Sequence, residues 1–236
     1  MTNRILLLSI IVFSFLLSCK EDQITNPKPE AVKYDTVKIC EQVWMLRNLD
    51  VDHYRNGDSI PEVRDSIEWR NLKTGAWCYY KNDSAMGKIF GKLYNWYAVN
   101  DSRGLSPAGW HVPTDDEWKE LEMCLGMSQP EADEIGYRGT DQSSQLAGGA
   151  DLWRAGALTS NTKFGTSGFS ALPGGFRDDH GWFNGFYDIG YSGGWWSSAD
   201  SSATNAWYRE LGYTSANIVR CDNNKVIGFS VRCVKD

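Results

Sequence analysis

The sequence is poor in the residues that mark the commonest kinds of chemical site. It has three histidines, no histidine close to a cysteine and no Cys-x-x-C pair, so the ligand spacing of a zinc site is missing. Acidic residues outnumber basic ones, 30 to 24, and no basic patch stands out, which argues against nucleic acid as a partner. Long apolar runs are absent beyond the first 17 residues, and no internal repeat is visible. We therefore expect no metal, no cofactor and no nucleic-acid partner.

The N-terminus carries the one long apolar run. Arg4 precedes Ile5 to Leu17, a segment interrupted only by two serines. Thirteen helical residues span about 20 Å, which is short of the roughly 30 Å hydrocarbon core, so a signal peptide is favoured over a transmembrane helix. The run ends in Leu16-Leu17-Ser18-Cys19, which resembles the bacterial lipobox. This predicts a signal peptide over residues 1–18 and lipidation of Cys19, with an ordinary secretory signal as the alternative.

The residues that follow Cys19 suggest where the protein goes. Lys20-Glu21-Asp22 resembles the export signal of Bacteroidetes lipoproteins that reach the outer face of the outer membrane; a plain charged tether is the alternative. Residues 19–32, with Pro27 and Pro29, read as a flexible tether. We therefore expect a cell-envelope protein, held at the outer membrane by its lipid and facing the cell surface, with one domain over 33–236.

The domain itself shows few helical patterns and many aromatic residues and glycines, including 11 Trp, 11 Tyr and 23 Gly. Val37 to Met45 predicts a hairpin, and Trp207–Leu211, Ser215–Val219 and Val226–Val234 predict strands, with a turn at Asp222-Asn223-Asn224. Residues 136–194 read as long ordered loops.

Two capping boxes predict helices. Thr114 stands three residues before Glu117, ahead of an apolar stripe that ends at Gly126. Ser128 with Glu131 predicts a second, shorter helix.

A series of short motifs runs in order through the domain. They are Gln42-Val43-Trp44-Met45, Asn48-Leu49, Arg55–Pro61, Cys78-Tyr79-Tyr80, Leu93–Val99, Gly109–Thr114 with Glu117-Trp118, Gly168–Gly175, Trp195–Ser198 and Gly228–Val234. In this order they resemble the Fibrobacter succinogenes major paralogous (FISUMP) domain of secreted and lipid-anchored bacterial proteins, from about Val37 to Asp236. That family in turn resembles the C-type-lectin-like fold of formylglycine-generating-enzyme relatives.

The resemblance implies an α+β, C-type-lectin-like fold: a small twisted antiparallel sheet, one or two helices and long ordered loops. It implies no established activity. The cysteines depart from the family pattern, because relatives have a cysteine near Ser106 and often a glycine where Cys40 stands. The disulfide candidates are Cys78, Cys124, Cys221 and Cys233, and the resemblance suggests Cys124 as a substitute partner for Cys233.

Several catalytic readings are disfavoured. Gly190–Gly194 matches the G-x-S-x-G pattern of hydrolases, but no histidine follows His180 and Trp195-Trp196 occupies the place of the expected helix. Cys221 and Cys233 invite comparison with the copper-binding pair of formylglycine-generating enzymes, but the surrounding residues do not match. Asp178-Asp179-His180 could hold a hard cation, though a solvated loop is favoured. We expect no enzyme.

Aromatic residues crowd the segment 176–210 and suit the apolar faces of sugar rings. The candidate ligand contacts are Trp182, Tyr187, Tyr191, Trp195, Trp196, Trp207, Arg177 and Asp178. The first hypothesis is a surface-anchored, non-enzymatic module that binds a glycan or protein through these loops. The second is a structural or adhesive envelope protein without a small ligand, and the third is an enzyme related to formylglycine-generating enzymes.

Overall fold

The computed structural model describes residues 33–179 and 185–236, and the part from Tyr34 to Asp236 forms one compact unit. The predicted signal peptide, the lipidation site at Cys19 and the candidate Trp182 lie outside the described residues. Within the described part of the chain, no helix has both the length and the apolar character needed to cross a membrane.

The predicted N-terminal hairpin is confirmed. Strand β1 (Thr36–Ile39) pairs antiparallel with β2 (Gln42–Met45), and Cys40 in the tight turn between them has a positive φ of 48°. Two short strands, β5 (Trp110–His111) and β12 (Val234–Lys235), complete a four-stranded sheet in the order β1-β2-β12-β5. The hairpin at the start of the domain is thus joined to its last residues.

The predicted closing strand, Val226–Val234, is wrong in its length, because only its end is a regular strand. Its earlier part exchanges backbone hydrogen bonds with three different elements. Gly228 N donates to Arg177 O (2.7 Å), Phe229 N to Tyr94 O (3.1 Å) and Ser230 N to Gly194 O (3.0 Å). This segment therefore fastens separate parts of the domain to one another instead of extending one sheet.

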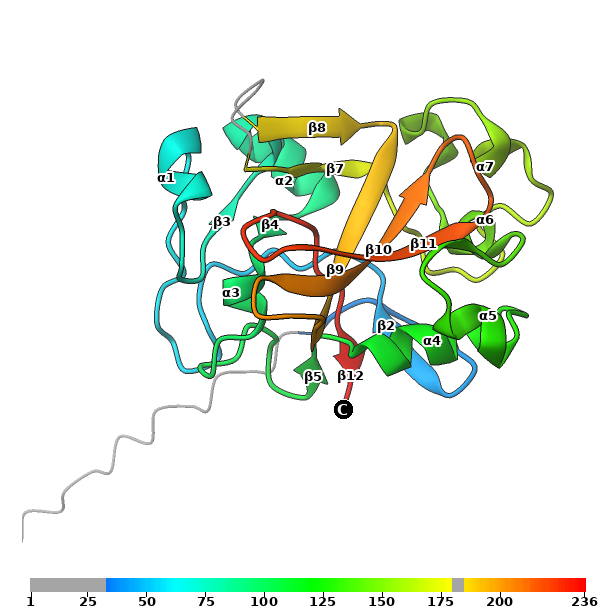
Figure 1. The fold of residues 1–236 in the computed structure, drawn as a ribbon, viewed down its shortest axis with the longest axis horizontal. Helices are drawn as coiled ribbons and strands as arrows, with labels where there is room; N and C mark the ends of the chain where they lie inside the picture. Colours follow the sequence, from blue (N-terminus) through cyan, green and yellow to red (C-terminus); the bar gives the residue numbers. More distant parts are fainter. Residues whose placement is uncertain (1–32, 180–184) are drawn as a thin grey trace, which may run out of the picture. The chain divides into compact units, whose positions relative to one another are not determined.

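The main sheet has six strands in the order β6-β11-β10-β9-β7-β8. Figure 1 labels β7, β8, β9, β10 and β11 of this sheet. The six strands are β6 (Gly136–Arg138), β7 (Gly174–Arg177), β8 (Phe186–Ile189), β9 (Ser192–Asp200), β10 (Asn205–Gly212) and β11 (Ile218–Asn224). All neighbours are antiparallel except β7 and β9. The turn predicted at Asp222–Asn224 is wrong: these residues continue β11, where Asp222 pairs with Trp207.

Short helices and one small two-stranded sheet fill the connections. The sheet pairs β3 (Trp77–Cys78) with β4 (Leu93–Tyr94). The helices are α1 (Ser66–Arg70), η1 (Tyr80–Asn82), α2 (Ser84–Phe90), α3 (Trp96–Val99), α4 (Asp115–Cys124), α5 (Gln129–Asp133), α6 (Gln142–Leu146), η2 (Ala150–Leu152) and α7 (Ala157–Ser160). Helices and largely antiparallel strands together confirm the predicted α+β class. The segment 136–194, predicted as loops, contains several of these elements.

The two predicted capping boxes are confirmed. At α4, Thr114 Oγ1 accepts from Glu117 N, while the Glu117 carboxylate accepts from Thr114 N at 2.8 Å. At α5, Ser128 and Glu131 make the same reciprocal pair. Each box satisfies backbone N–H groups that a helix start leaves without partners.

A buried charge network fixes α4 to the large sheet. The Glu122 carboxylate accepts from both terminal nitrogens of Arg138 (2.7 and 3.0 Å) and from Arg209 Nε (2.6 Å). Asp115 accepts from Arg209 Nη1 (2.8 Å) and Arg220 Nη2 (2.7 Å). Glu122, Arg138 and Arg209 have fully buried side chains, so removing the Glu122 carboxylate would leave Arg138 without its carboxylate partner and Arg209 with Asp115 alone.

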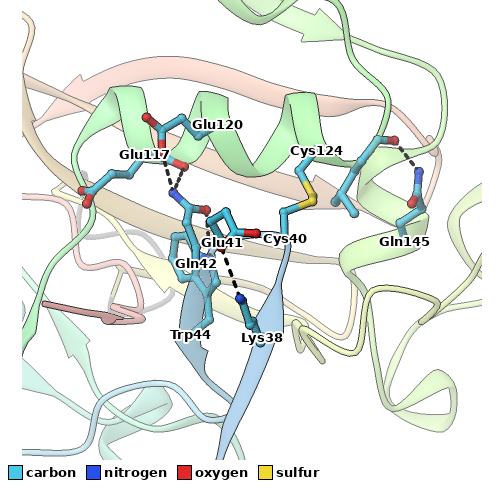
Figure 2. The surroundings of a disulfide bond; sticks show 10 residues. Lys38, Cys40, Glu41, Gln42, Trp44, Glu117, Glu120, Cys124 and Gln145 are labelled. Carbon is cyan, nitrogen blue, oxygen red and sulfur yellow. Dashed lines mark hydrogen bonds and ion pairs between the residues drawn. A yellow bond between two sulfur atoms is a disulfide. The ribbon is translucent and has the colours of Figure 1, made fainter.

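One disulfide ties the hairpin turn to the end of α4. Cys40 and Cys124 are bonded, with their Cα atoms 6.4 Å apart, and Gln42 Nε2 donates to the Glu117 carbonyl nearby (Figure 2). Cys124 is therefore a disulfide cysteine, as predicted, but its partner is Cys40 and not Cys233. The other three candidates, Cys78, Cys221 and Cys233, are free. Cys233 is buried in one hydrophobic cluster of the core, whereas half-buried Cys124 at the end of α4 packs against another.

Candidate functional site

Three of the predicted ligand contacts are core residues, so the prediction is wrong for them. Trp195 and Trp196 are 1% and 0% exposed, and their indole N–H groups donate to Asn48 Oδ1 and Tyr94 O, both at 2.9 Å. Arg177 is fully buried and donates to the carbonyl oxygens of residues 63–65. Successive residues of β9 point to opposite faces of the sheet, and here both faces are covered.

Two other predicted contacts are engaged with arginines. Tyr191, 42% exposed, accepts a hydrogen bond from Arg154 Nη1 (2.8 Å) and meets Tyr213 edge to face. Half-buried Trp207 lies under the Arg220 guanidinium, 3.9 Å from its ring centre. Among the described residues, neither belongs to a larger group of aromatic rings.

Two candidates remain: Tyr187 lies in β8, and Asp178 directly follows β7. Asp178 N donates to Gly185 O at 2.7 Å, which closes the end of this strand pair. Tyr187 pairs directly with Phe176 across the two strands, and their rings stack with centroids 5.7 Å apart. Both rings are half-buried, so each leaves part of its surface open.

Within the described residues, a row of aromatic rings runs from Tyr187 across the large sheet. Phe176 contacts Phe229 at 5.8 Å between centroids, and Phe229 stacks on Tyr208 at 4.6 Å with an interplanar angle of 16°. Phe229 and Tyr208 are buried, so the accessible end of the row is at Phe176 and Tyr187. We call these four residues the aromatic row.

Glycines make this row possible. A Cβ atom on Gly194 of β9 would lie 2.5 Å from the Phe229 ring, and one on Gly175 would lie 2.2 Å from the Tyr187 carbonyl oxygen. Gly175 also has a positive φ of 63°. Side chains at either position would therefore displace the rings or the strands.

Carboxyl groups accompany the row. Glu210 lies two residues after Tyr208 on β10, so the two side chains share a face, and its backbone is opposite Gly194. Burial and, to a smaller extent, the charge of Asp188 raise the pKa of Glu210 to about 7, although a hydrogen bond with Tyr208 acts to lower it. Asp188, next to Tyr187 on β8, is exposed, and partial desolvation raises its pKa as well. Aromatic faces and carboxylate acceptors thus occur on neighbouring strands.

The sequence missed Phe176 and Glu210 as site residues. The alternation of Ala206, Tyr208 and Glu210 against Trp207, Arg209 and Leu211 in β10 could have placed Glu210 with the aromatics. Phe176 gave no comparable signal, because its position depends on pairing with Tyr187 and on a distant ring, Phe229.

The described residues do not form the geometry that the hydrolase and metal-binding hypotheses require. Gly190–Gly194 leads through a turn into β9, with Ser192 as the first strand residue, so the strand–turn–helix of a hydrolase nucleophile is not formed there. Across residues 33–179 and 185–236, no three His, Cys, Asp or Glu side chains group as metal ligands. His180, the last residue of the Asp178-Asp179-His180 motif, falls outside that range.

The architecture is that of an α+β domain in which a six-stranded sheet carries a row of aromatic rings. The family model of the Fibrobacter succinogenes major domain matches residues 37–235, and the chain belongs to this family. No curated protein and no solved structure matched the chain. The relationship to C-type lectins therefore stays a prediction.

Proposed function

We propose that this protein is a lipid-anchored binding module of the cell envelope, which recognises saccharides at the open end of the aromatic row. The observation that supports this most is the stacked, half-buried pair of Phe176 and Tyr187, followed across the sheet by Glu210. Sugar rings stack their C–H faces on aromatic rings, and carboxylates accept hydrogen bonds from sugar hydroxyls. The anchor would be the lipid on Cys19, and the protein would not act as an enzyme.

The rings are already held in place by the sheet, which favours binding. Phe176 and Tyr187 are fixed by strand pairing and by the contact of Phe176 with Phe229. Little side-chain entropy would therefore be lost when a ligand covers them.

A glycan array and titration calorimetry with residues 33–236 would test this proposal. Tyr187→Ala should weaken the binding of a neutral oligosaccharide about tenfold, the loss of roughly 1.4 kcal/mol of stacking. Tyr191→Ala is the matched control, because it removes an exposed tyrosine outside the row and should leave binding within twofold. Both variants must keep the circular-dichroism spectrum of the parent.

The opposite pattern would contradict the proposal. If no neutral glycan binds, or if both tyrosine variants lose binding equally, the aromatic row is not a saccharide site. A structural or adhesive role, or a protein ligand, would then be the better account.

The half-buried carboxyl group offers a second readout. With a pKa of about 7, Glu210 changes its charge between pH 6 and pH 8. Because the carboxylate accepts two hydrogen bonds more readily than the protonated acid, saccharide affinity should rise over this interval and become nearly independent of pH in Glu210→Gln.

A further inference from the structure

A cavity of about 340 Å³ is lined by residues outside the aromatic row. Its wall includes Asn48, which is hydrogen-bonded to the Trp195 indole, whereas the row packs against Trp196. Adjacent strand residues point to opposite faces, so the two features are on different sides of the sheet. The walls come from segments far apart in sequence, near residues 46–48, 88–89, 149, 170–172 and 232.

The charge of the cavity is of one sign. Arg47, Lys88 and Arg232 line it, and none of the described residues that line it is acidic. Arg47 and Lys88 are exposed, and in the described parts of the chain neither makes an ion pair. In a chain whose net charge is −6, three cations around one cavity are a local departure from the overall charge.

The third cation is a buried arginine that has no carboxylate partner in the described part of the chain. Arg232 is 1% exposed; Nε and Nη2 donate to Asn48 Oδ1 at 3.2 and 2.8 Å. Nη1 donates to Phe169 O, and Nη2 also approaches Ser170 O at 3.4 Å. A guanidinium has five N–H donors, so one on Nη1 is left without an acceptor among the residues described.

Other buried arginines show what is different here. Arg138 and Arg209 are neutralised by Glu122. Arg177 donates to backbone carbonyls from both terminal nitrogens and leaves Nε without an acceptor among the described residues, but it does not line this cavity. Buried charges are ordinarily paired, because leaving water is costly for an ion. The desolvation of Arg232 lowers its pKa to about 9, in keeping with a cation that lacks a counter-ion.

The remaining wall suits a small organic molecule. Leu46, Ile89 and Leu172 supply apolar surface, and Ser170 and Asn48 supply polar groups. The volume is at the lower end of the 300–1,000 Å³ range of small-molecule sites, which fits a single sugar-sized ring and not a polymer.

We propose that this cavity binds the oxyanion of a small organic ligand of monosaccharide size, with Arg232 at its wall and Lys88 and Arg47 at its opening. The ligand would carry a carboxylate or phosphate, the groups that guanidinium recognises best. This site is separate from the saccharide surface proposed above and does not depend on it.

Titration of residues 33–236 with four probes would test the proposal: glucuronate, glucose 6-phosphate, inorganic phosphate and glucose. Amide and arginine Nε–H signals in NMR spectra would locate the binding. We expect the two charged sugars to bind, to shift the signals of residues 46–48, 88–89, 170–172 and Arg232, and to bind more weakly as salt is added. Binding of inorganic phosphate at the same residues would support an oxyanion site and identify the free ion as a possible source.

Charge variants on the exposed rim avoid disturbing the core. The double variant Arg47→Ala, Lys88→Ala should weaken glucuronate binding at least tenfold. Lys73→Ala removes an exposed lysine outside the cavity and should change the affinity less than twofold. Ile89→Trp, which adds bulk at the cavity wall, should reduce the binding of every anionic probe.

Three results would overturn the proposal: no anion binds at millimolar concentration, glucose binds as tightly as glucuronate, or Lys73→Ala weakens binding as much as the rim variant does. Each can occur whether or not neutral oligosaccharides bind at Tyr187, so the two proposals can fail separately.

Discussion

Removing the disulfide between Cys40 and Cys124 should cost much of the stability of the domain. The two cysteines are 84 positions apart. In the chain-entropy model, closing a loop of this length lowers the entropy of the unfolded chain, which raises its free energy by about 4.5 kcal/mol at 25 °C. Measured losses are typically about 2–4 kcal/mol, which is a large part of the roughly 5–15 kcal/mol of a whole domain. We therefore expect the free energy of unfolding of the double variant Cys40→Ser, Cys124→Ser to be about 2–4 kcal/mol lower than that of the parent.

The assay is urea unfolding of residues 33–236, followed by tryptophan fluorescence, with and without a reductant. The parent should lose stability in reductant, whereas the double serine variant should be indifferent to it. Thiol titration of the denatured, unreduced parent should find three of its five cysteines free. A loss under 1 kcal/mol, or five titratable thiols, would refute the reasoning.

A glycine variant separates the bond from the backbone conformation. Cys40 has φ 48°, a left-handed conformation that costs a non-glycine residue about 1 kcal/mol. Cys40→Gly, Cys124→Ser should therefore be about 1 kcal/mol more stable than the double serine variant. If the two double variants are equally stable, backbone strain at this turn does not contribute to the stability of the domain.

Three further changes test buried and titratable groups. Glu122→Gln should destabilise the domain by about 3–5 kcal/mol in urea unfolding, because it leaves Arg138 and Arg209 buried without their shared carboxylate; a loss below 1 kcal/mol would contradict this. The pKa of Glu210 is about 7 in the folded protein, above its unfolded value, so this residue lowers the stability of the domain as pH rises from about 4.5 through 7. Glu210→Gln should therefore raise the free energy of unfolding by on the order of 2 kcal/mol relative to the parent at pH 8 and by little at pH 4. Equal gains at the two pH values would refute this prediction. Burial alone would lower the pKa of His111, but hydrogen bonds to Asp236 and Glu117 outweigh this effect and raise the pKa. The contribution of His111 to stability is therefore complete below about pH 6.5 and is lost above the raised pKa. His111→Ala should destabilise the domain more at pH 5.5 than at pH 8.5, with a difference under about 1 kcal/mol because these ion pairs are partly exposed.

Local signals in the sequence were sufficient for the parts of the fold that depend on neighbours. The capping pairs at Thr114 and Ser128 were predictable because each partner lies three residues away. The hairpin at Val37–Met45 was predictable for the same reason, since its strands are joined by a tight turn. The family motifs extended this to an α+β domain, because many of them occur in a fixed order.

The candidate site was less predictable, because exposure is decided by distant segments. Trp195 and Trp196 look like ligand contacts in sequence, yet Asn48 and Tyr94 cover them from elsewhere in the chain. The cavity at Arg232 depends on Asn48, 184 positions away, and no local pattern reports such a contact. A crowded aromatic sequence predicts a rich core or a binding surface equally well, and only the three-dimensional pairing separates the two.

The odd number of cysteines in the domain raises the question of why one bridge forms and stays in place. Thiol exchange requires a thiolate, and burial raises the pKa of Cys78 to about 11 and that of Cys233 to about 12. Both would therefore be poor attackers of the Cys40–Cys124 bond even where an oxidising compartment allows disulfides. Cys221 is only half-buried, so iodoacetamide applied to the native protein at pH 8 should label it at least tenfold faster than the two buried thiols. Mass spectrometry of the peptides would measure these rates; equal labelling of all three would mean that the core opens often enough for burial to give no protection.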